Sequence, residues 1–98
     1  MSAEPAARQD AAVVTVRYWA GARAAAGVVE EVVEFPIMAG EARLPTVGDV
    51  LTEVSARHTG LGAVLSVCAL LVDGHRVEPG DPAPVGEVLE VLPPFAGG

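Results

Sequence analysis

Lysine is absent from this sequence of 98 residues, and all six basic side chains are arginine. The chain therefore cannot accept an isopeptide bond on a lysine side chain or form a lysine Schiff base. Cys68 is the single cysteine, so an internal disulfide is impossible and nothing indicates an oxidising compartment. Aromatic residues make up only 4% while 51% of the residues are hydrophobic, so the core of one small domain must consist of Val, Leu and Ala.

Long hydrophobic runs are also missing. The longest uncharged stretch, residues 59–72, falls short of the roughly 20 residues that a membrane-spanning helix needs. Charged residues among residues 1–12 leave no apolar segment for a signal peptide. The net charge of −7 repels a phosphate backbone and an anionic lipid surface. We therefore expect a soluble cytoplasmic protein that binds neither nucleic acid nor membrane, and whose protein partners present basic patches.

The first half of the chain predicts two strands. Residues 13–19 are β-branched and aromatic, with Val14, Val16 and Tyr18 on one face. Residues 28–35 predict a second strand, which Pro36 should break. The run 22–26 between them favours a helical turn that is too short to be stable alone. Strands joined so closely are expected to pair antiparallel.

A helix is predicted to begin after Thr46, whose hydroxyl can cap it, with Asp49 as an acidic variant of the capping box. Gly60 can supply the left-handed stop. Four apolar residues share helical spacing and form one stripe that suits packing on a sheet. These are Val47, Val50, Leu51 and Val54.

The second half predicts three more strands. Residues 64–72 are apolar and β-prone, and the dipeptide at 73–74 is Asp-Gly, a signal for a tight hairpin with a return strand at 76–78. A proline-rich surface loop at 79–86 precedes the last strand, 87–92. The chain thus divides into a disordered segment (1–12), a domain (13–92) and a flexible tail (93–98). The order predicts an α+β fold with one main helix across a mixed sheet of four to five strands. With the first and last strands central, this is the β-grasp, or ubiquitin-like, roll.

The tail is the predicted functional site. Pro93 and Pro94 end the strand ladder and favour an extended exit, and Phe95 is a lone apolar anchor for a partner's pocket. Ala96 and Gly97 lead to Gly98, and glycine can pass through a slot too narrow for a side chain. The Gly98 carboxylate then becomes a chemical handle. The alternative is that the two glycines are only a frayed end.

Several segments resemble the ubiquitin-like sulfur carriers, and the small subunit of molybdopterin synthase is the nearest match among them. The similar segments are 14–23, 46–51, 72–74 and, most specifically, the ending 92–98 with its Pro-Pro-x-x-Gly-Gly pattern. The resemblance implies that an adenylating enzyme of the ubiquitin-activating kind uses ATP to convert the Gly98 carboxylate to an acyl-adenylate. A sulfur donor protein then makes a thiocarboxylate, which the large subunit uses in molybdenum cofactor synthesis.

On this interpretation the chain is a co-substrate and not an enzyme, and it binds no cofactor or metal itself. Three alternatives stay open: a carrier for thiamine or cysteine synthesis, a binding module with an idle tail, and a modifier that is conjugated to other proteins. Other candidate residues favour structural roles. Cys68 is predicted to be a core residue within a strand, His58 and His75 lack ligand partners at metal spacing, Glu30 and Glu31 are predicted to lie on a solvated face, and Trp19 fits core or rim.

Overall fold

The computed structural model describes residues 11–37 and 44–94 of the chain. The elements in these two ranges are, in chain order, β1 (Ala11–Tyr18), α2 (Ala20–Ala26), β2 (Glu30–Pro36), α3 (Val47–Arg57), α4 (Leu61–Leu65), β3 (Ala69–Val72), β4 (His75–Arg76) and β5 (Val88–Leu92).

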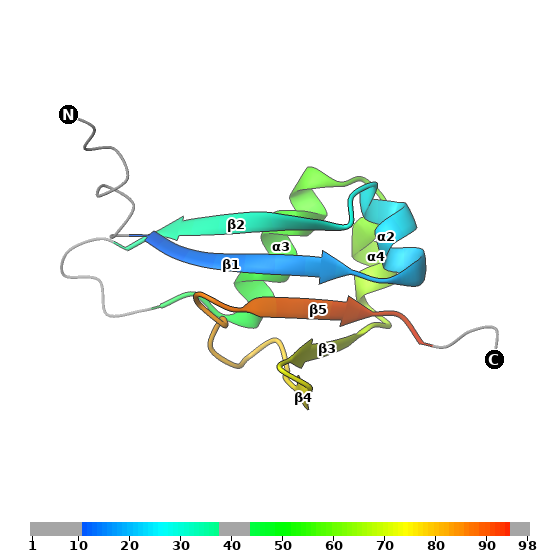
Figure 1. Cartoon of the computed structure of the whole chain (residues 1–98). Helices are drawn as coiled ribbons and strands as arrows, with labels where there is room; N and C mark the ends of the chain where they lie inside the picture. Colours follow the sequence, from blue (N-terminus) through cyan, green and yellow to red (C-terminus); the bar gives the residue numbers. More distant parts are fainter. Residues whose placement is uncertain (1–10, 38–43, 95–98) are drawn as a thin grey trace.

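The strands form one five-stranded sheet in the order β2-β1-β5-β3-β4. The first and last strands lie side by side in its centre and run parallel, whereas every other pair is antiparallel. The helices cover one face of this sheet, with α2 and α4 at the end where β1 and β5 finish (Figure 1). The predicted α+β, β-grasp architecture is confirmed, with α3 as the longest helix of the described chain.

Strand β1 shows the predicted alternation, because every second residue from Ala12 to Tyr18 is buried. These side chains face the helices and begin the core. The strand starts at Ala11, and the Ala12 side chain is only 1% exposed. The prediction that residues 1–12 are disordered was therefore wrong for Ala11 and Ala12, which pair with Pro36 and Phe35 of β2. Residues 1–10 lie outside the described part.

Strand β2 is shifted from the predicted range. It begins at Glu30 because Gly27, at φ 79°, ends α2 and leaves Val28 and Val29 exposed in the connection. The short helix α2 forms where only a docked turn was predicted. Pro36 does not break β2 but is its last residue, opposite Ala11. Because β2 is an edge strand, the missing N–H of proline costs no ladder bond at this position.

The N-terminus of α3 has the predicted capping box. The Asp49 N–H donates to Thr46 Oγ1 at 3.1 Å, and the Thr46 N–H donates to the Asp49 carboxylate at 2.9 Å. The loop 79–86 adds acceptors for two further N–H groups: Val47 donates to the Asp81 carbonyl and Gly48 to that of Pro79. The loop that the sequence placed on the surface therefore also caps the main helix.

The segment before β3 differs most from prediction. Residues 64 and 65 belong to helix α4, which buries Leu61 and Leu65 at a spacing of four, so the strand begins only at Ala69. The hairpin at Asp73 and Gly74 is confirmed, with φ values of 52° and 80° as a type I′ turn requires. The return strand is shorter and earlier than predicted, His75–Arg76 in place of residues 76–78.

The core lies between the central strands and the helices. The predicted stripe of α3 packs there, with Val47, Val50 and Val54 fully buried and Leu51 half-buried against the same cluster. Tyr18 is the largest fully buried side chain, and no other aromatic ring is buried among residues 11–37 and 44–94. The remaining core members are aliphatic, as the composition predicted.

Candidate functional site

The base of the predicted tail is fixed in the sheet. Leu92, the last residue of β5, pairs with Ala69 of β3, and the Val91 carbonyl accepts the Trp19 N–H at 3.1 Å on the other side. Pro93 is half-buried and Pro94 exposed, and neither belongs to a strand. The other predicted site residues, 95–98, lie outside the described residues. The strand therefore ends where the prolines were expected to end it.

The sheet face opposite the helices lies next to this base. In one row across the strands, the register places Val32 beside Thr15 and Thr15 beside Val88. In the next row towards the tail, Arg17 lies between Glu30 and Glu90. The face combines the exposed Val32 with the carboxylates of Glu30 and Glu90, and no element of the described chain covers it (Figure 1). Such a mixture suits a partner whose contact surface is apolar with basic neighbours.

Trp19 lies at the same end of the molecule, between β1 and α2. Its side chain is 38% exposed, and the Arg23 guanidinium carbon lies 5.6 Å from the ring centroid. The sequence left its position open between core and rim. The structure places it at the rim, where a cation–π contact holds the ring.

Glu30 and Glu31 have different surroundings. Glu30 is exposed and forms an ion pair with Arg17 at 3.0 Å. Glu31 faces inward and accepts hydrogen bonds from the Tyr18 hydroxyl and from Arg57 Nη1, the latter at 3.2 Å. His58 Nε2 lies 2.7 Å from Glu31 Oε2, the oxygen that also accepts from Tyr18. The prediction of a solvated face thus holds for Glu30 and was wrong for Glu31.

Hydrogen bonds keep the Glu31 carboxylate ionised. Burial alone would raise the pKa of Glu31, but the hydrogen bonds from Tyr18, His58 and Arg57 outweigh it, so the pKa lies below the ordinary value of a glutamate. Burial, together with the Glu31 carboxylate, raises the pKa of Tyr18, which keeps its hydroxyl protonated as a donor. The Glu31 cluster therefore links β1, β2 and the end of α3 through one carboxylate.

Sequence reasoning missed this cluster, although a signal was available. The period of two in β2 puts residue 31 on the same face as Val33 and Phe35, which pack in the core. A carboxylate on that face needs partners. His58 is the C-cap of α3, the helix whose apolar stripe was expected to pack on the sheet.

Cys68 lies between α4 and β3, not within a strand as predicted. It packs against the core, its thiol donates to the Val64 carbonyl at 3.1 Å, and burial raises its pKa. His75 is exposed in β4. No group of three or more His, Cys, Asp or Glu side chains in the described ranges could hold a metal ion.

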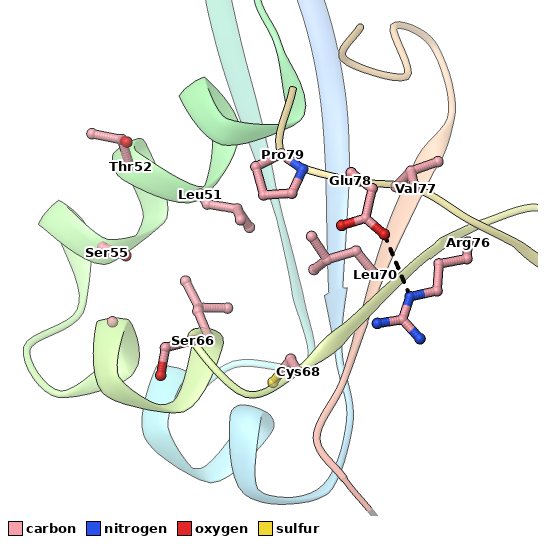
Figure 2. A pocket seen from close by; sticks show the side chains of 12 residues that line it. Leu51, Thr52, Ser55, Ser66, Cys68, Leu70, Arg76, Val77, Glu78 and Pro79 are labelled. Carbon is pink, nitrogen blue, oxygen red and sulfur yellow. Dashed lines mark ion pairs between the residues drawn. The ribbon is translucent and has the colours of Figure 1, made fainter. Parts of the chain in front are cut away.

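A groove of about 550 Å³ opens beside Cys68, between α3, α4 and the short strands (Figure 2). Its floor includes Leu51, Leu65 and Leu70, and the exposed ion pair of Arg76 and Glu78 lies at its rim. Sequence reasoning did not foresee it. Helix α4, part of which was expected to be strand, contributes Gly62 and Leu65 to its lining.

A protein-family model described as the ThiS family matches residues 16–98, a range that includes the whole predicted tail. The chain belongs to the ThiS family. This membership confirms the resemblance to ubiquitin-like sulfur carriers inferred from the tail and the strand order. No curated protein matches the chain in sequence.

Solved structures share the fold. A putative molybdopterin converting factor subunit 1 from Pyrococcus furiosus is 27% identical with a TM-score of 0.71, covering 86% of this chain and 99% of its own. Small archaeal modifier protein 1 from Haloferax volcanii is 23% identical, with a TM-score of 0.65 and coverage of 86% and 99%. A chain in a complex of subunits 1 and 2 of molybdopterin-converting factor from Helicobacter pylori is 23% identical, with a TM-score of 0.55 and coverage of 88% and 99%.

These findings make the chain a member of the ThiS family of ubiquitin-like sulfur carriers. None of the helices within residues 11–37 and 44–94 is long and apolar enough to cross a membrane.

Proposed function

We propose that this ThiS-family chain carries sulfur as a thiocarboxylate on Gly98 for molybdopterin synthesis in the cytoplasm. The observation that supports this most is the family match, which extends through the Gly-Gly ending, combined with a sheet that ends at Leu92. The domain fixes the base of the tail at Leu92, and in this proposal the partners act on the residues that follow. Gly98 is the terminal residue in this proposal.

The chemistry follows from the weakness of a carboxylate as an acyl donor. A partner enzyme of the ubiquitin-activating kind uses ATP to form an acyl-adenylate on Gly98, whose AMP is a good leaving group. A sulfur donor protein then replaces AMP with sulfur, which gives the ionised thiocarboxylate nucleophile. ATP is consumed by the partner, and this chain binds no cofactor of its own.

Three partners follow from this sequence of steps: the adenylating enzyme, the sulfur donor and the large subunit of molybdopterin synthase. Support for the third is the Helicobacter pylori neighbour, whose name describes subunits 1 and 2 in a complex. The acidic chain, with a net charge of −7, favours basic surfaces on all three and speeds their encounter. The sheet face around Val32, Arg17 and Glu90 is the contact surface we propose for them, because it leads directly to the tail.

The first test is the intact mass of the protein from its native cells. A fraction about 16 Da heavier, in which sulfur replaces one terminal oxygen, is expected, together with ATP-dependent adenylation by a cognate activating enzyme. Gly98 recovered on a lysine of another protein would indicate a modifier instead. Failure of the activating enzyme to adenylate Gly98 would overturn the proposal.

The second test compares a variant that lacks Gly97 and Gly98 with one that adds a single alanine after Gly98. Both should lose carrier activity completely while keeping the melting temperature of the unaltered chain, because neither change touches the described domain. A binding module with an idle tail would keep its function in both. Loss of molybdoenzyme activity in cells that carry either variant supports the molybdopterin pathway, and a requirement for thiamine or cysteine would redirect the sulfur.

A further inference from the structure

We propose that the open face of the sheet docks the adenylating enzyme through one basic side chain of that enzyme, which enters a pocket beside Glu90. The inference rests on the proposed function, because the partner is the activating enzyme of that cycle. It adds the residue of the face that the enzyme recognises and the charge that the enzyme must supply there.

The pocket has a volume of about 320 Å³ and lies on β5, between β1 and the end of β3. Leu89 and Val91 of β5 are fully buried in the core. The period of two therefore turns Val88 and Glu90 to the opposite, open face of the sheet. Two valines and four charged residues line the pocket: Arg17, Val72, Asp73, Glu87, Val88 and Glu90.

The charges around this pocket are unbalanced. Three of the lining side chains are carboxylates, and the guanidinium of Arg17 is the single cation among them. Arg17 Nε already donates to Glu30 at 3.0 Å. In the register Arg17 lies between Glu30 and Glu90, so this ion pair compensates the β2 side and leaves the β5 side acidic. A complementary partner must therefore bring positive charge to the β5 side.

Glu90 is the carboxylate of the pocket that the chain itself does not satisfy. It is half-buried, and it forms no hydrogen bond or ion pair with any residue in the ranges 11–37 and 44–94. A cation gains more at a half-buried carboxylate than at a fully exposed one, because less water screens the attraction. Asp73 and Glu87 are exposed at the rim and attract the same cation.

A long basic side chain suits this pocket better than a metal ion. Within the described part of the chain, the three carboxylates do not form a group that could hold a metal ion. A guanidinium has five N–H donors in a planar fork, so it can serve carboxylates that lie apart from one another. Its aliphatic stem would contact Val72 and Val88. Arginine is therefore the side chain that fits the pocket best.

The position of Glu90 connects this contact to the tail. Glu90 precedes Leu92, the last residue of β5, by two residues, or about 7 Å along the strand. An arginine bound there keeps the enzyme at the base of the tail, while Arg17 repels a second cation from the β2 side. The pocket thus sets the orientation in which the enzyme docks.

The test measures the dissociation constant (Kd) of the full chain with its cognate adenylating enzyme by calorimetry, in the absence of ATP. Glu90→Gln keeps the size of the side chain and should raise the Kd about tenfold. Glu53→Gln is the matched control, because it removes the same charge from the exposed surface of α3, and it should change the Kd by less than about twofold. Arg17→Gln should lower the Kd about threefold, since it removes the cation that repels the incoming arginine. A damaged fold does not produce such a gain of affinity.

Salt provides a second readout, because screening weakens the attraction to Glu90. The Kd of the unaltered chain should rise more steeply with salt than the Kd of Glu90→Gln. Equal Kd values for Glu90→Gln and Glu53→Gln, or weaker binding by Arg17→Gln, would overturn this proposal alone. If the unaltered chain does not bind the enzyme, this proposal and the assigned partner both fail, whereas the mass of the native protein tests the thiocarboxylate separately.

Discussion

The two sides of the sheet are built differently. On the β2 side, β1 and β2 pair over seven residues, and the Glu31 cluster ties both strands to the end of α3. On the β4 side, β3 and β4 share only two pairs, the ion pair of Arg76 and Glu78 is 68% exposed at both ends, and a groove separates the strands from α3. Stability is therefore concentrated on the side far from Cys68.

Different strands hold the helix layer and the base of the tail. The long ladder and the inward carboxylate hold the helix layer, whereas the central pair β1 and β5 fixes the base of the tail. Strand β3 also pairs with β5 at the base of the tail, whereas the two-residue strand β4 contributes little to either task. Substitutions on the two sides should accordingly differ in cost even when the residue types match.

The largest contrast is expected between Val33→Ala and Val77→Ala. Val33 is fully buried on the β2 side, and its truncation should cost about 2–3 kcal/mol from lost burial and the cavity that remains. Val77 is half-buried at the groove and should cost about 1 kcal/mol or less, because solvent fills the space. Urea unfolding measures both. Equal costs would show that the two sides are packed alike.

Neighbouring glutamates provide the second contrast. Glu31→Gln should cost about 2 kcal/mol, because Tyr18, His58 and Arg57 lose a charged acceptor that is only 14% exposed. Glu30→Gln removes an exposed ion pair and should cost about 0.5 kcal/mol or less. In a domain of this size, about 1 kcal/mol shifts the melting temperature by about 4–8 °C, so calorimetry separates the two variants. A similar shift for both would disprove the bridging role of Glu31.

The pH dependence of stability isolates the same carboxylate. The pKa of Glu31 is lowered in the folded protein, so its contribution is complete above its unfolded value, about 4.3, and is lost as the pH falls through the folded value. The stability difference between the unaltered chain and Glu31→Gln should thus be constant above about pH 5.5 and shrink below about pH 4. Glu30→Gln serves as the control, with a small difference throughout. A constant difference down to pH 2 would mean that Glu31 does not titrate with folding.

Features that depend on near neighbours were predicted better than features that depend on distant contacts. Alternation in β1, the capping box at Thr46 and the Asp73-Gly74 turn depend on near neighbours, and each was confirmed. The sequence could not place α4, because five apolar residues fit a strand or a buried helix equally well until the contacts of Leu61 and Leu65 decide between them. The Glu31 cluster and the groove depend on contacts distant in sequence. The predicted reacting residue Gly98 lies outside the described residues, so its role stays a prediction.

The smallest effect on the unfolding free energy should come from breaking the ion pair of Arg76 and Glu78 at the groove. A small effect there would support the difference between the two sides of the sheet. Arg76 Nε and the Glu78 carboxylate are 3.8 Å apart and both are 68% exposed, so solvent screens their attraction. We expect Arg76→Gln to leave the unfolding free energy within about 0.3 kcal/mol of the unaltered chain. Arg57→Gln is the matched control on the β2 side, because Arg57 bonds both Glu31 and the Val32 carbonyl, and it should cost clearly more. Urea unfolding of the two variants at low and high salt checks this. A cost for Arg76→Gln as large as that for Arg57→Gln would mean that charge pairs stabilise the β4 side as strongly as the β2 side.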